Sequence, residues 1–372
     1  MNLKHRYPIV MCRNNDHNYD FGIIGYANKK NLTIRTYFFY LYFLLYALIT
    51  PFSLLSAQTN KNAGWDIIKI GGRDYVSVEG IKKFYSFTKL NRAGNLVILQ
   101  NVKVEMKLKV GGNECLMNNV KFVFSHAVVA SGKGIYVSRM DLTKLIDPVL
   151  RPNHIGNARD CRTVILDAGH GGKDPGSTNS IGTEAAYNLR LAMRLKGLLQ
   201  AKGFRVKLIR DSDRFYSLQQ RVDIANSVKD NAIFVSLHFN SGGSHARGIE
   251  TFTLSPPGVS NYESDFKASD AVARAGNEHD SANIALATAL HGSVLRRLGN
   301  NTLDRGIKRA RFSVLTGVKH PAVLFEGGFM SHAYEARLIA NESYQSAIAQ
   351  GMLDAITRYR FAVARKPAKP KR

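Results

Sequence analysis

The sequence has few cysteines, a shortage of acidic residues and no apolar run of full membrane-span length, and each of these absences narrows the possible classes of protein. Its three cysteines, Cys12, Cys115 and Cys161, include no C-x-x-C pair, which excludes a zinc ribbon and a dithiol redox motif. Cys115 and Cys161 form either one disulfide in an oxidising compartment or two free buried thiols. The metalloprotease motif H-E-x-x-H is also missing, so a zinc site borne on a single helix is excluded.

Acidic residues are outnumbered by basic ones, with 28 Asp and Glu against 52 Lys and Arg and a net charge of +24. The excess is spread along the chain, so we expect attraction to polyanions such as an anionic wall polymer or membrane surface. The sequence shows no interleaved aromatic and basic motif and no nucleic-acid-binding signature, so nucleic acid is not an expected partner. General surface basicity without a specific partner is the simpler alternative.

The longest apolar run covers residues 37–49 and is shorter than the ~20 residues that a helix needs to cross a bilayer. It follows a basic segment and precedes Leu55-Ser56-Ala57, an order typical of a secretory signal cleaved after Ala57. If the run is extended through Leu55, an uncleaved membrane anchor is the alternative. Residues 1–57 therefore predict an N-terminal extension and signal peptide, and export to the periplasm or cell envelope.

Residues 58–152 predict a small β-rich domain. Short runs of alternating polar and apolar residues, separated by Gly, Asn and Arg turns, are typical of strands. The runs cover residues 66–70, 74–78, 95–100, 104–110, 120–125 and 134–138. One helix is predicted over residues 77–87. The region resembles the stalk-type domain related to the copper amine oxidase N-terminal domain, and it has no cluster of acids or histidines, so we expect it to be dispensable for chemistry.

In residues 159–362 strands alternate with helices, which predicts an α/β domain with a mostly parallel sheet flanked by helices. Helices are expected over residues 183–202, 217–228 and 281–299, the second with a capping box made by Ser217 and Gln220. The basic, proline-containing tail, residues 363–372, is expected to be disordered.

Three predicted strands of this domain end in a side chain that can bind a metal or a proton. The run TVILDAGH ends on His170, AIFVSLHFN ends on His238, and PAVLFEGGF carries Glu326 before paired glycines. Because parallel strands deliver their carboxyl ends to one edge of a sheet, we expect these side chains to meet in one crevice. Glu184, in the first turn of the helix that follows the first strand, is expected at the same place.

Two imidazoles and one carboxylate are the ligands of a catalytic zinc ion that keeps a fourth position for water. His170, Glu184 and His238 supply that set, which suits zinc better than magnesium or calcium. Such chemistry also needs a carboxylate outside the ligand set to accept a proton, and Glu326 is the remaining acid of the crevice.

The segments DAGHGGKDPG, SLHFN, RGIETF, DRGIK and PAVLFEGGFMS stand in the same order as in a known family. Over residues 163–361 the chain resembles the zinc-dependent N-acetylmuramoyl-L-alanine amidases. The resemblance implies one zinc ion held by His170, Glu184 and His238, with Glu326 as general base. It also implies hydrolysis of the amide between N-acetylmuramic acid and L-alanine in peptidoglycan. A zinc peptidase for another wall amide and an inactive wall-binding module are the alternatives, and the intact ligand set argues against the second.

Weaker expectations concern the surroundings of the crevice. Asp167 either orients His170 through a hydrogen bond or caps the turn after its strand. Asn240 and Arg247 are candidates for lining the substrate groove, and Phe239 departs from the small residue that the family often has there. An activator protein is not assigned by any feature of the sequence.

Overall fold

The computed structural model describes residues 59–60 and 65–364. The predicted N-terminal extension and signal, residues 1–57, and most of the expected disordered tail lie outside the described residues. Within the described part, no helix combines the length and the apolar character needed to cross a membrane.

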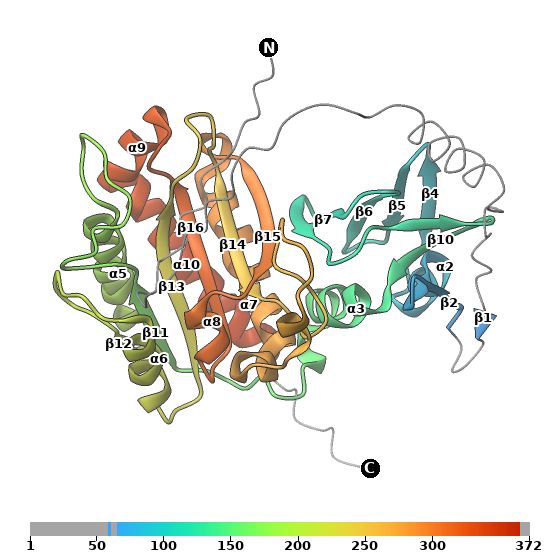
Figure 1. The fold of residues 1–372 in the computed structure, drawn as a ribbon, viewed down its shortest axis with the longest axis horizontal. Coiled ribbons are helices and arrows are strands. Elements are labelled where there is room, and N and C mark those ends of the chain that lie inside the picture. Colours follow the sequence, from blue (N-terminus) through green and yellow to red (C-terminus); the bar gives the residue numbers. More distant parts are fainter. Residues whose placement is uncertain (1–58, 61–64, 365–372) are drawn as a thin grey trace, which may run out of the picture. The chain divides into compact units, whose positions relative to one another are not determined.

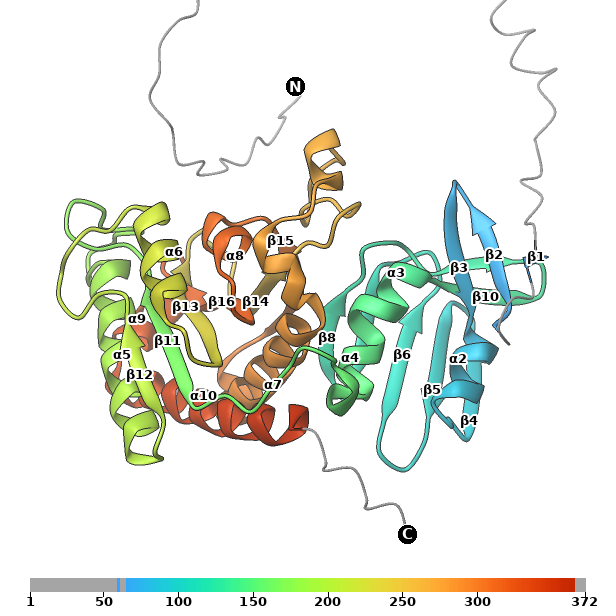
Figure 2. The ribbon, with the colours of Figure 1, turned by 90° about the horizontal axis from the view of Figure 1, so that it is seen from below.

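The first part of the chain is built from antiparallel strands (Figures 1 and 2). Its elements are β1 (Thr59–Asn60), β2 (Ile67–Ile70), β3 (Arg73–Ser77), α2 (Val78–Phe84), β4 (Lys89–Ala93), β5 (Leu96–Gln100), β6 (Glu105–Lys109), β7 (Glu114–Met117), β8 (Val120–Val123), β9 (Val129–Ser131) and β10 (Gly134–Ser138). One sheet has the order β1-β2-β3-β10-β9, and β4 to β8 form a meander. The predicted helix begins after Ser77, whose hydroxyl accepts from the Gly80 amide at 3.1 Å, and the positive φ of Ser86 (56°) follows its end.

A helical segment that the sequence analysis did not predict follows β10. It comprises α3 (Arg139–Asp141), η2 (Leu142–Ile146), α4 (Asp147–Leu150) and η3 (Pro152–His154). Ser138 caps its start by accepting from the Asp141 amide at 3.0 Å. Leu142, Leu145 and Ile146 are buried at helical spacing, so the apolar pattern for this helix was present in the sequence.

The second part alternates strands and helices. Its elements are β11 (Thr163–Ala168), α5 (Glu184–Ala201), β12 (Arg205–Leu208), α6 (Leu218–Ser227), β13 (Ala232–Asn240), β14 (Ile249–Leu254), η4 (Ala268–Ala271), η5 (Ala275–His279), α7 (Asp280–Leu298), η6 (Gly299–Asn301), β15 (Asp304–Ala310), α8 (Ser313–Gly317), β16 (Ala322–Phe329), α9 (Ala333–Ala340) and α10 (Glu342–Val363). The predicted capping box is confirmed, because the Ser217 and Gln220 side chains each accept from the other residue's backbone amide. Strand β15 was not predicted.

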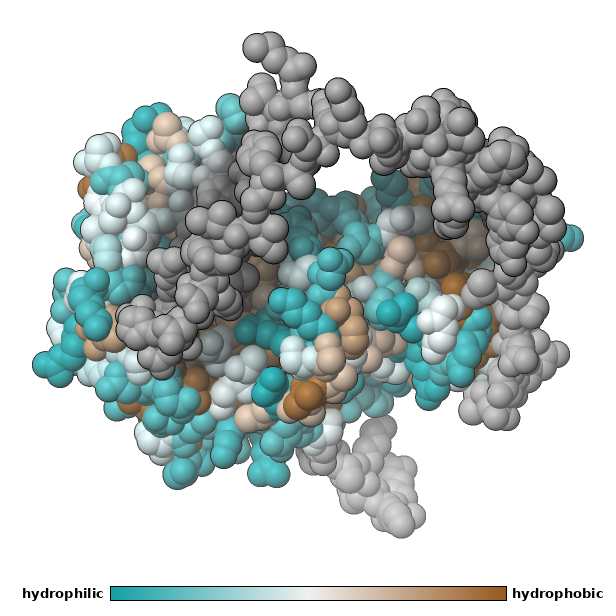
Figure 3. Space-filling view, viewed as in Figure 1, coloured by the Kyte–Doolittle hydropathy of each residue, from teal (hydrophilic) through white to brown (hydrophobic). Residues whose placement is uncertain are grey.

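The strands of this part have the order β12-β11-β13-β16-β14-β15. All neighbours are parallel except β14 and β16, so the predicted fold class is confirmed. Figure 2 shows the sheet between two helical layers, with α5, α7 and α10 on one face and α6 and α8 on the other. Figure 3 shows one face of the molecule, and the part of it that is not drawn in grey is mostly hydrophilic. The ends of β11, β13 and β16 meet at one edge, as the strand pattern predicted.

The sheet continues from β15 into β8, through the pair Ile307 and Phe122. A buried ion pair joins the same two parts, since the Arg309 guanidinium lies 3.3 Å from the Asp141 carboxylate. Arg309 also donates to the Lys144 carbonyl at 2.9 Å. The predicted boundary between domains near residues 152–159 stays a prediction, but the two parts share one sheet and one buried charge pair.

Neither described cysteine forms a disulfide. Cys115 and Cys161 are free and buried. Burial raises the pKa of the Cys161 thiol to about 11 and also raises the pKa of Cys115. Of the two alternatives, the structure has the pair of free buried thiols.

Candidate metal centre

His170 lies in the turn that directly follows β11, with a left-handed backbone (φ 60°). The residue before it must be small, because a Cβ on Gly169 would lie 2.1 Å from the His238 ring. Gly176 has a positive φ (65°), and a Cβ there would lie 2.6 Å from the His170 ring. The glycines of this segment therefore leave room for two imidazoles packed against the backbone.

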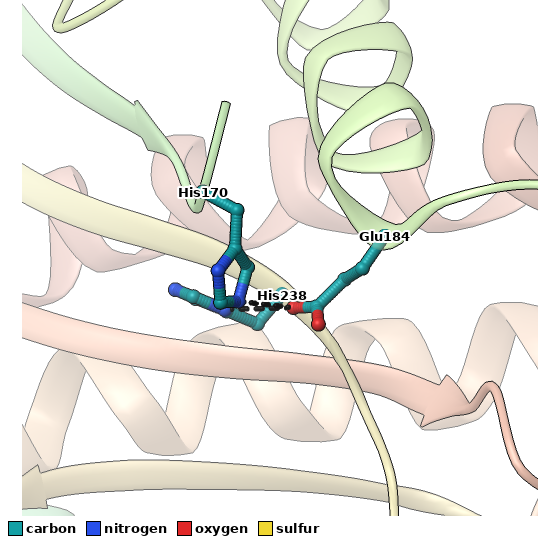
Figure 4. Close-up of side chains that lie close together, drawn as sticks. All are labelled: His170, Glu184 and His238. Atoms are coloured by element: carbon teal, nitrogen blue, oxygen red, sulfur yellow. Dashed lines mark hydrogen bonds and ion pairs between the residues drawn. The ribbon is translucent and has the colours of Figure 1, made fainter. Parts of the chain in front are cut away.

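Glu184 is the first residue of α5 and is 5% exposed. Thr183 caps the helix, and its hydroxyl accepts from the Ala186 amide at 3.3 Å. This start directs the Glu184 carboxylate toward the end of β13. Its Oε1 lies 3.2 Å from His170 Nε2 and 2.9 Å from His238 Nδ1 (Figure 4).

The structure thus brings together the three side chains that the sequence analysis proposed as ligands. One ligand atom from each of His170, Glu184 and His238 lies within 4.8 Å of the others. The imidazole centroids are 5.1 Å apart and the rings are nearly perpendicular, at 80°. Two nitrogens and one carboxylate oxygen that converge in this way, partly shielded from water, suit a zinc ion with an open coordination position.

Electrostatics within the cluster favour a cation at its centre. Burial disfavours ionised Glu184, but hydrogen bonds from His170 and His238 lower the pKa of its carboxyl well below the ordinary range. Burial likewise disfavours a charged His170, yet Glu184 and Asp174 outweigh it and raise the pKa of that imidazole to about 9. A divalent cation would satisfy the same carboxylate and displace protons from the imidazoles.

Asp174 holds His170 in the orientation that a metal ligand needs. His170 Nδ1 lies 2.8 Å from Asp174 Oδ2, and the Gly176 amide donates to the other carboxylate oxygen at 3.1 Å. Because a carboxylate only accepts, Nδ1 carries a proton, and a cation that displaced the second proton, on Nε2, would meet the lone pair of that nitrogen. The sequence analysis missed Asp174, although it lies four residues after His170 in the same glycine-rich turn.

The expectation that Asp167 orients His170, or caps the turn, is wrong. Asp167 lies on β11 opposite Ser236 of β13, and its Oδ2 accepts from the Ser236 hydroxyl at 2.9 Å. Its Oδ1 accepts from Arg221 at 2.6 Å. Strand alternation places Asp167 on the sheet face next to Ser236, so its carboxylate is used by these two groups and not by the imidazole.

Two buried arginines fix the backbone that carries His170. Arg210 donates to the Ala168 and Gly169 carbonyls at 2.8 and 2.9 Å. Arg221 donates to the Ala168 and His170 carbonyls at 2.9 and 2.6 Å. No local spacing in the sequence links these arginines to the turn, because they reach it from the segments after β12 and within α6.

Glu326 occupies β16 opposite His238 of the parallel neighbour β13. It is 9% exposed, and its Oε2 has no hydrogen-bond partner among the described residues. Burial raises the pKa of Glu326, and the nearby carboxylates of Glu184 and Glu250 raise it further. A buried carboxyl with a free oxygen and a raised pKa is suited to accept and release a proton.

The remaining candidates occupy different places around the crevice. Asn240 donates from its amide to the Glu250 carboxylate at 2.6 Å. Arg247 is exposed in the segment before β14, and among the described residues it makes no hydrogen bond or ion pair with the cluster. Phe239 is fully buried against Tyr187, with ring centroids 6.4 Å apart, so it packs in the core and does not shape the groove.

A three-layer α/β fold with a buried acid beside a His-Glu-His cluster that could hold a metal ion, at the ends of parallel strands, is an arrangement suited to a hydrolase. Residues 164–358, about half of the chain, match the family described as N-acetylmuramoyl-L-alanine amidase. The chain belongs to this family of peptidoglycan amidases, whose members hydrolyse an amide of the cell wall.

Individual proteins are similar to this chain over the same region. The chain is 30% identical to the uncharacterized protein YqiI of Bacillus subtilis over 198 residues, which cover 53% of this chain and 84% of that protein. It is 31% identical to N-acetylmuramoyl-L-alanine amidase LytC of B. subtilis over 208 residues, 56% of this chain but 37% of LytC. It matches the amidase AmiC of Neisseria meningitidis at 30% identity, covering 55% of this chain and 54% of AmiC. The catalytic domain of CwlV, from Bacillus (Paenibacillus) polymyxa var. colistinus, is 33% identical with a TM-score of 0.44, covering 53% of this chain and 97% of that domain.

Proposed function

We propose that this protein is an exported, zinc-dependent N-acetylmuramoyl-L-alanine amidase that acts on peptidoglycan. The observation that supports this most is the convergence of His170, Glu184 and His238 within 4.8 Å of one another, beside a buried acid. The family match gives the substrate class, and the donor set gives the metal.

In this proposal His170, Glu184 and His238 would hold the zinc ion. When bound, the ion supplies a water of lowered pKa and polarises the scissile carbonyl. Asp174 keeps His170 in the required tautomer, and Arg210 and Arg221 keep its backbone in place. These groups position the ligands and do not contact the reacting atoms.

Glu326 handles the proton. Its ionised carboxylate accepts a proton from the attacking water, and the resulting carboxylic acid donates it to the departing amine nitrogen of alanine. The raised pKa of Glu326 makes the first transfer easier, because in this buried site the protonated form is less costly than the ionised one. All four side chains are in place, so no observation favours an inactive wall-binding module.

The expected partner is peptidoglycan, with general attraction of the +24 chain to anionic wall or membrane surfaces. An envelope location follows from the substrate.

Digestion of purified muropeptides, followed by mass spectrometry, tests the function directly. We expect stem peptides that begin with a free alanine amine, and the complementary N-acetylmuramic acid ends. Cleavage at another amide of the peptide would support a zinc peptidase instead. Retention on peptidoglycan without any released fragment would support a binding module.

A further inference from the structure

A second charged cluster lies beside Glu326 and takes no part in holding the metal. Glu250 of β14 lies opposite Glu326 in the antiparallel pair and is 3% exposed. Its carboxylate forms ion pairs with Lys308 and, at 3.1 Å, with Arg305, both from β15. We call Glu250, Lys308 and Arg305 the β15 charge cluster.

The cluster carries two cations for one carboxylate. Lys308 is buried, and its ammonium pairs with Glu250 and lies 4.2 Å from the centroid of the Tyr262 ring. Burial of an ammonium requires such a partner. Because Glu250 brings one negative charge to two cations, the cluster keeps a net positive charge.

Arg305 is also the member that solvent can reach. Its side chain is 36% exposed, against 3% for Lys308. Its guanidinium lies 4.7 Å from the centroid of the Phe329 ring, and only its Nε donates to Glu250. Among the described residues, the two terminal nitrogens of Arg305 donate to no protein atom. The Arg305 guanidinium is oriented by a ring and a carboxylate, and its two terminal nitrogens are free to donate. Such a guanidinium can bind a second carboxylate.

Arg305 lies close to Glu326, the proposed general base. Glu326, Glu250 and Arg305 lie on three consecutive strands, β16, β14 and β15. Neighbouring strands are about 4.8 Å apart, so Arg305 lies on the order of 10 Å from Glu326. An extended peptide advances about 3.5 Å per residue, so Arg305 is within reach of the second or third residue from the cleaved bond.

A cavity of about 510 Å³ lies next to this cluster. Tyr262, whose ring contacts Lys308, lines it together with residues from β8 and its following turn, such as Ser125.

We propose that Arg305 binds a carboxylate of the peptide portion of the substrate, at the residue that follows the alanine. This inference rests on the proposed function, because it assumes that a wall peptide occupies the crevice. A peptide with a free acid at that residue would be bound more tightly than one with the amide, so the site would distinguish the two forms. The alternative is that Arg305 serves only as a partner of Glu250, in which case the charge of the substrate would not matter.

Two soluble muropeptides that differ only in this group, a free acid and its amide, provide the test. We expect wild-type protein to hydrolyse the acid with a kcat/KM about tenfold higher or more, the usual effect of a charge-assisted hydrogen bond, mainly through KM. Arg305→Gln should remove this preference and leave kcat on the amide within a few-fold. Arg305→Lys keeps the ion pair with Glu250 but lacks the fork of donors, so it should retain part of the preference.

Arg297→Gln is the matched control. Arg297 is an arginine of α7 in a surface pair with Asp354 at 3.2 Å, and its loss should leave the preference unchanged. If wild-type protein hydrolyses acid and amide equally well, the proposal is overturned without any variant. The same result follows if Arg305→Gln keeps the preference.

Calorimetric binding of the two free peptides separates this inference from the proposed function. If wild-type protein hydrolyses neither muropeptide but binds the acid peptide more tightly than the amide, the proposed function fails and the carboxylate site stands. If it binds both peptides equally, or neither, the carboxylate site fails as well.

Discussion

At the scale of single residues, two carboxylates of the crevice differ in their surroundings. Glu184 receives hydrogen bonds from two imidazoles and two backbone amides, so its charge is stabilised. Glu326 is buried with one oxygen that has no hydrogen-bond partner among the described residues, so its charge is disfavoured. These opposite environments support our proposal that Glu184 binds the metal and Glu326 transfers the proton.

Replacing each acid by its amide should show this difference. Glu326→Gln keeps the shape but cannot accept a proton, so kcat should fall by about 10²–10⁴-fold while zinc content stays near that of wild type. Glu184→Gln removes the anionic ligand and should lose zinc together with activity. Bound zinc and turnover are measured on both variants side by side. Loss of zinc from Glu326→Gln, or near-normal turnover, would mean that Glu326 has been given the wrong role.

The acid side of the pH profile should report the raised pKa of Glu326. Below that pKa the carboxyl is protonated and cannot act as a base, so kcat/KM should rise with pH through it. A bound cation offsets the charge of Glu184, but burial and the charge of Glu250 remain, so the midpoint should lie above the ordinary glutamate range near ~4.3. A midpoint at or below that value, at constant zinc content, would argue against Glu326 as the base.

At the scale of elements, the site depends on residues 169–183, the segment between β11 and α5. The start of this segment has little space, since the His238 ring occupies the position where a Gly169 side chain would begin. Two arginines from later segments hold its carbonyls, and Thr183 sets the start of α5. Of the three proposed ligands, Glu184 and His238 therefore lie on regular elements, and His170 lies in the turn that directly follows β11.

Gly169→Ala should damage the centre without unfolding the domain. The new Cβ would lie 2.1 Å from the His238 ring, so the imidazole must move away from Glu184 and zinc affinity should fall by tenfold or more. Gly197→Ala, within α5, meets no atom within 4 Å and should stabilise the protein by about 0.5–1 kcal/mol. Zinc titration and thermal unfolding of both variants check this. Unchanged zinc affinity in Gly169→Ala would show that the crevice is looser than described.

The sequence predicts those parts of the site that follow from the pattern of a single strand, and it does not predict those that depend on which strands become neighbours. His170, His238 and Glu326 each end an apolar run, and parallel strands end at one edge, so their meeting followed from the pattern. The contacts of Arg210 and Arg221 with the turn after β11 did not follow from the pattern, and neither did the ion pairs of Glu250. These contacts depend on the order of strands in the sheet. Strand β15 was missed for a related reason. Its residues 304–310 are mostly polar or charged, and they form a strand because β14 and β8 pair with both of its edges.

At the scale of the whole molecule, the β-rich part and the amidase part meet through more than a linker. Strands β15 and β8 pair, and Arg309 of the amidase part is buried against Asp141 of the other part. Asp141 is fully buried and also accepts from the Ser125 amide at 2.8 Å and the Ser138 hydroxyl at 2.6 Å. Our expectation that the β-rich part is dispensable for the chemical step stays a prediction, but its removal would also remove these contacts.

Asp141→Asn tests whether the two parts unfold as one. The substitution leaves the buried Arg309 guanidinium without its anion, and loss of one partner of a buried ion pair costs about 3–5 kcal/mol. If the parts are coupled, the whole protein should unfold in a single transition at lower temperature or denaturant concentration. Asp74→Asn is the control, because Asp74 forms an exposed pair with Arg139 at 3.3 Å and its loss should change stability by less than about 1 kcal/mol. Unfolding of both variants is followed by calorimetry and by far-ultraviolet circular dichroism. Two separate transitions, with only the first shifted by Asp141→Asn, would show instead that the amidase part folds independently of the sheet that continues it.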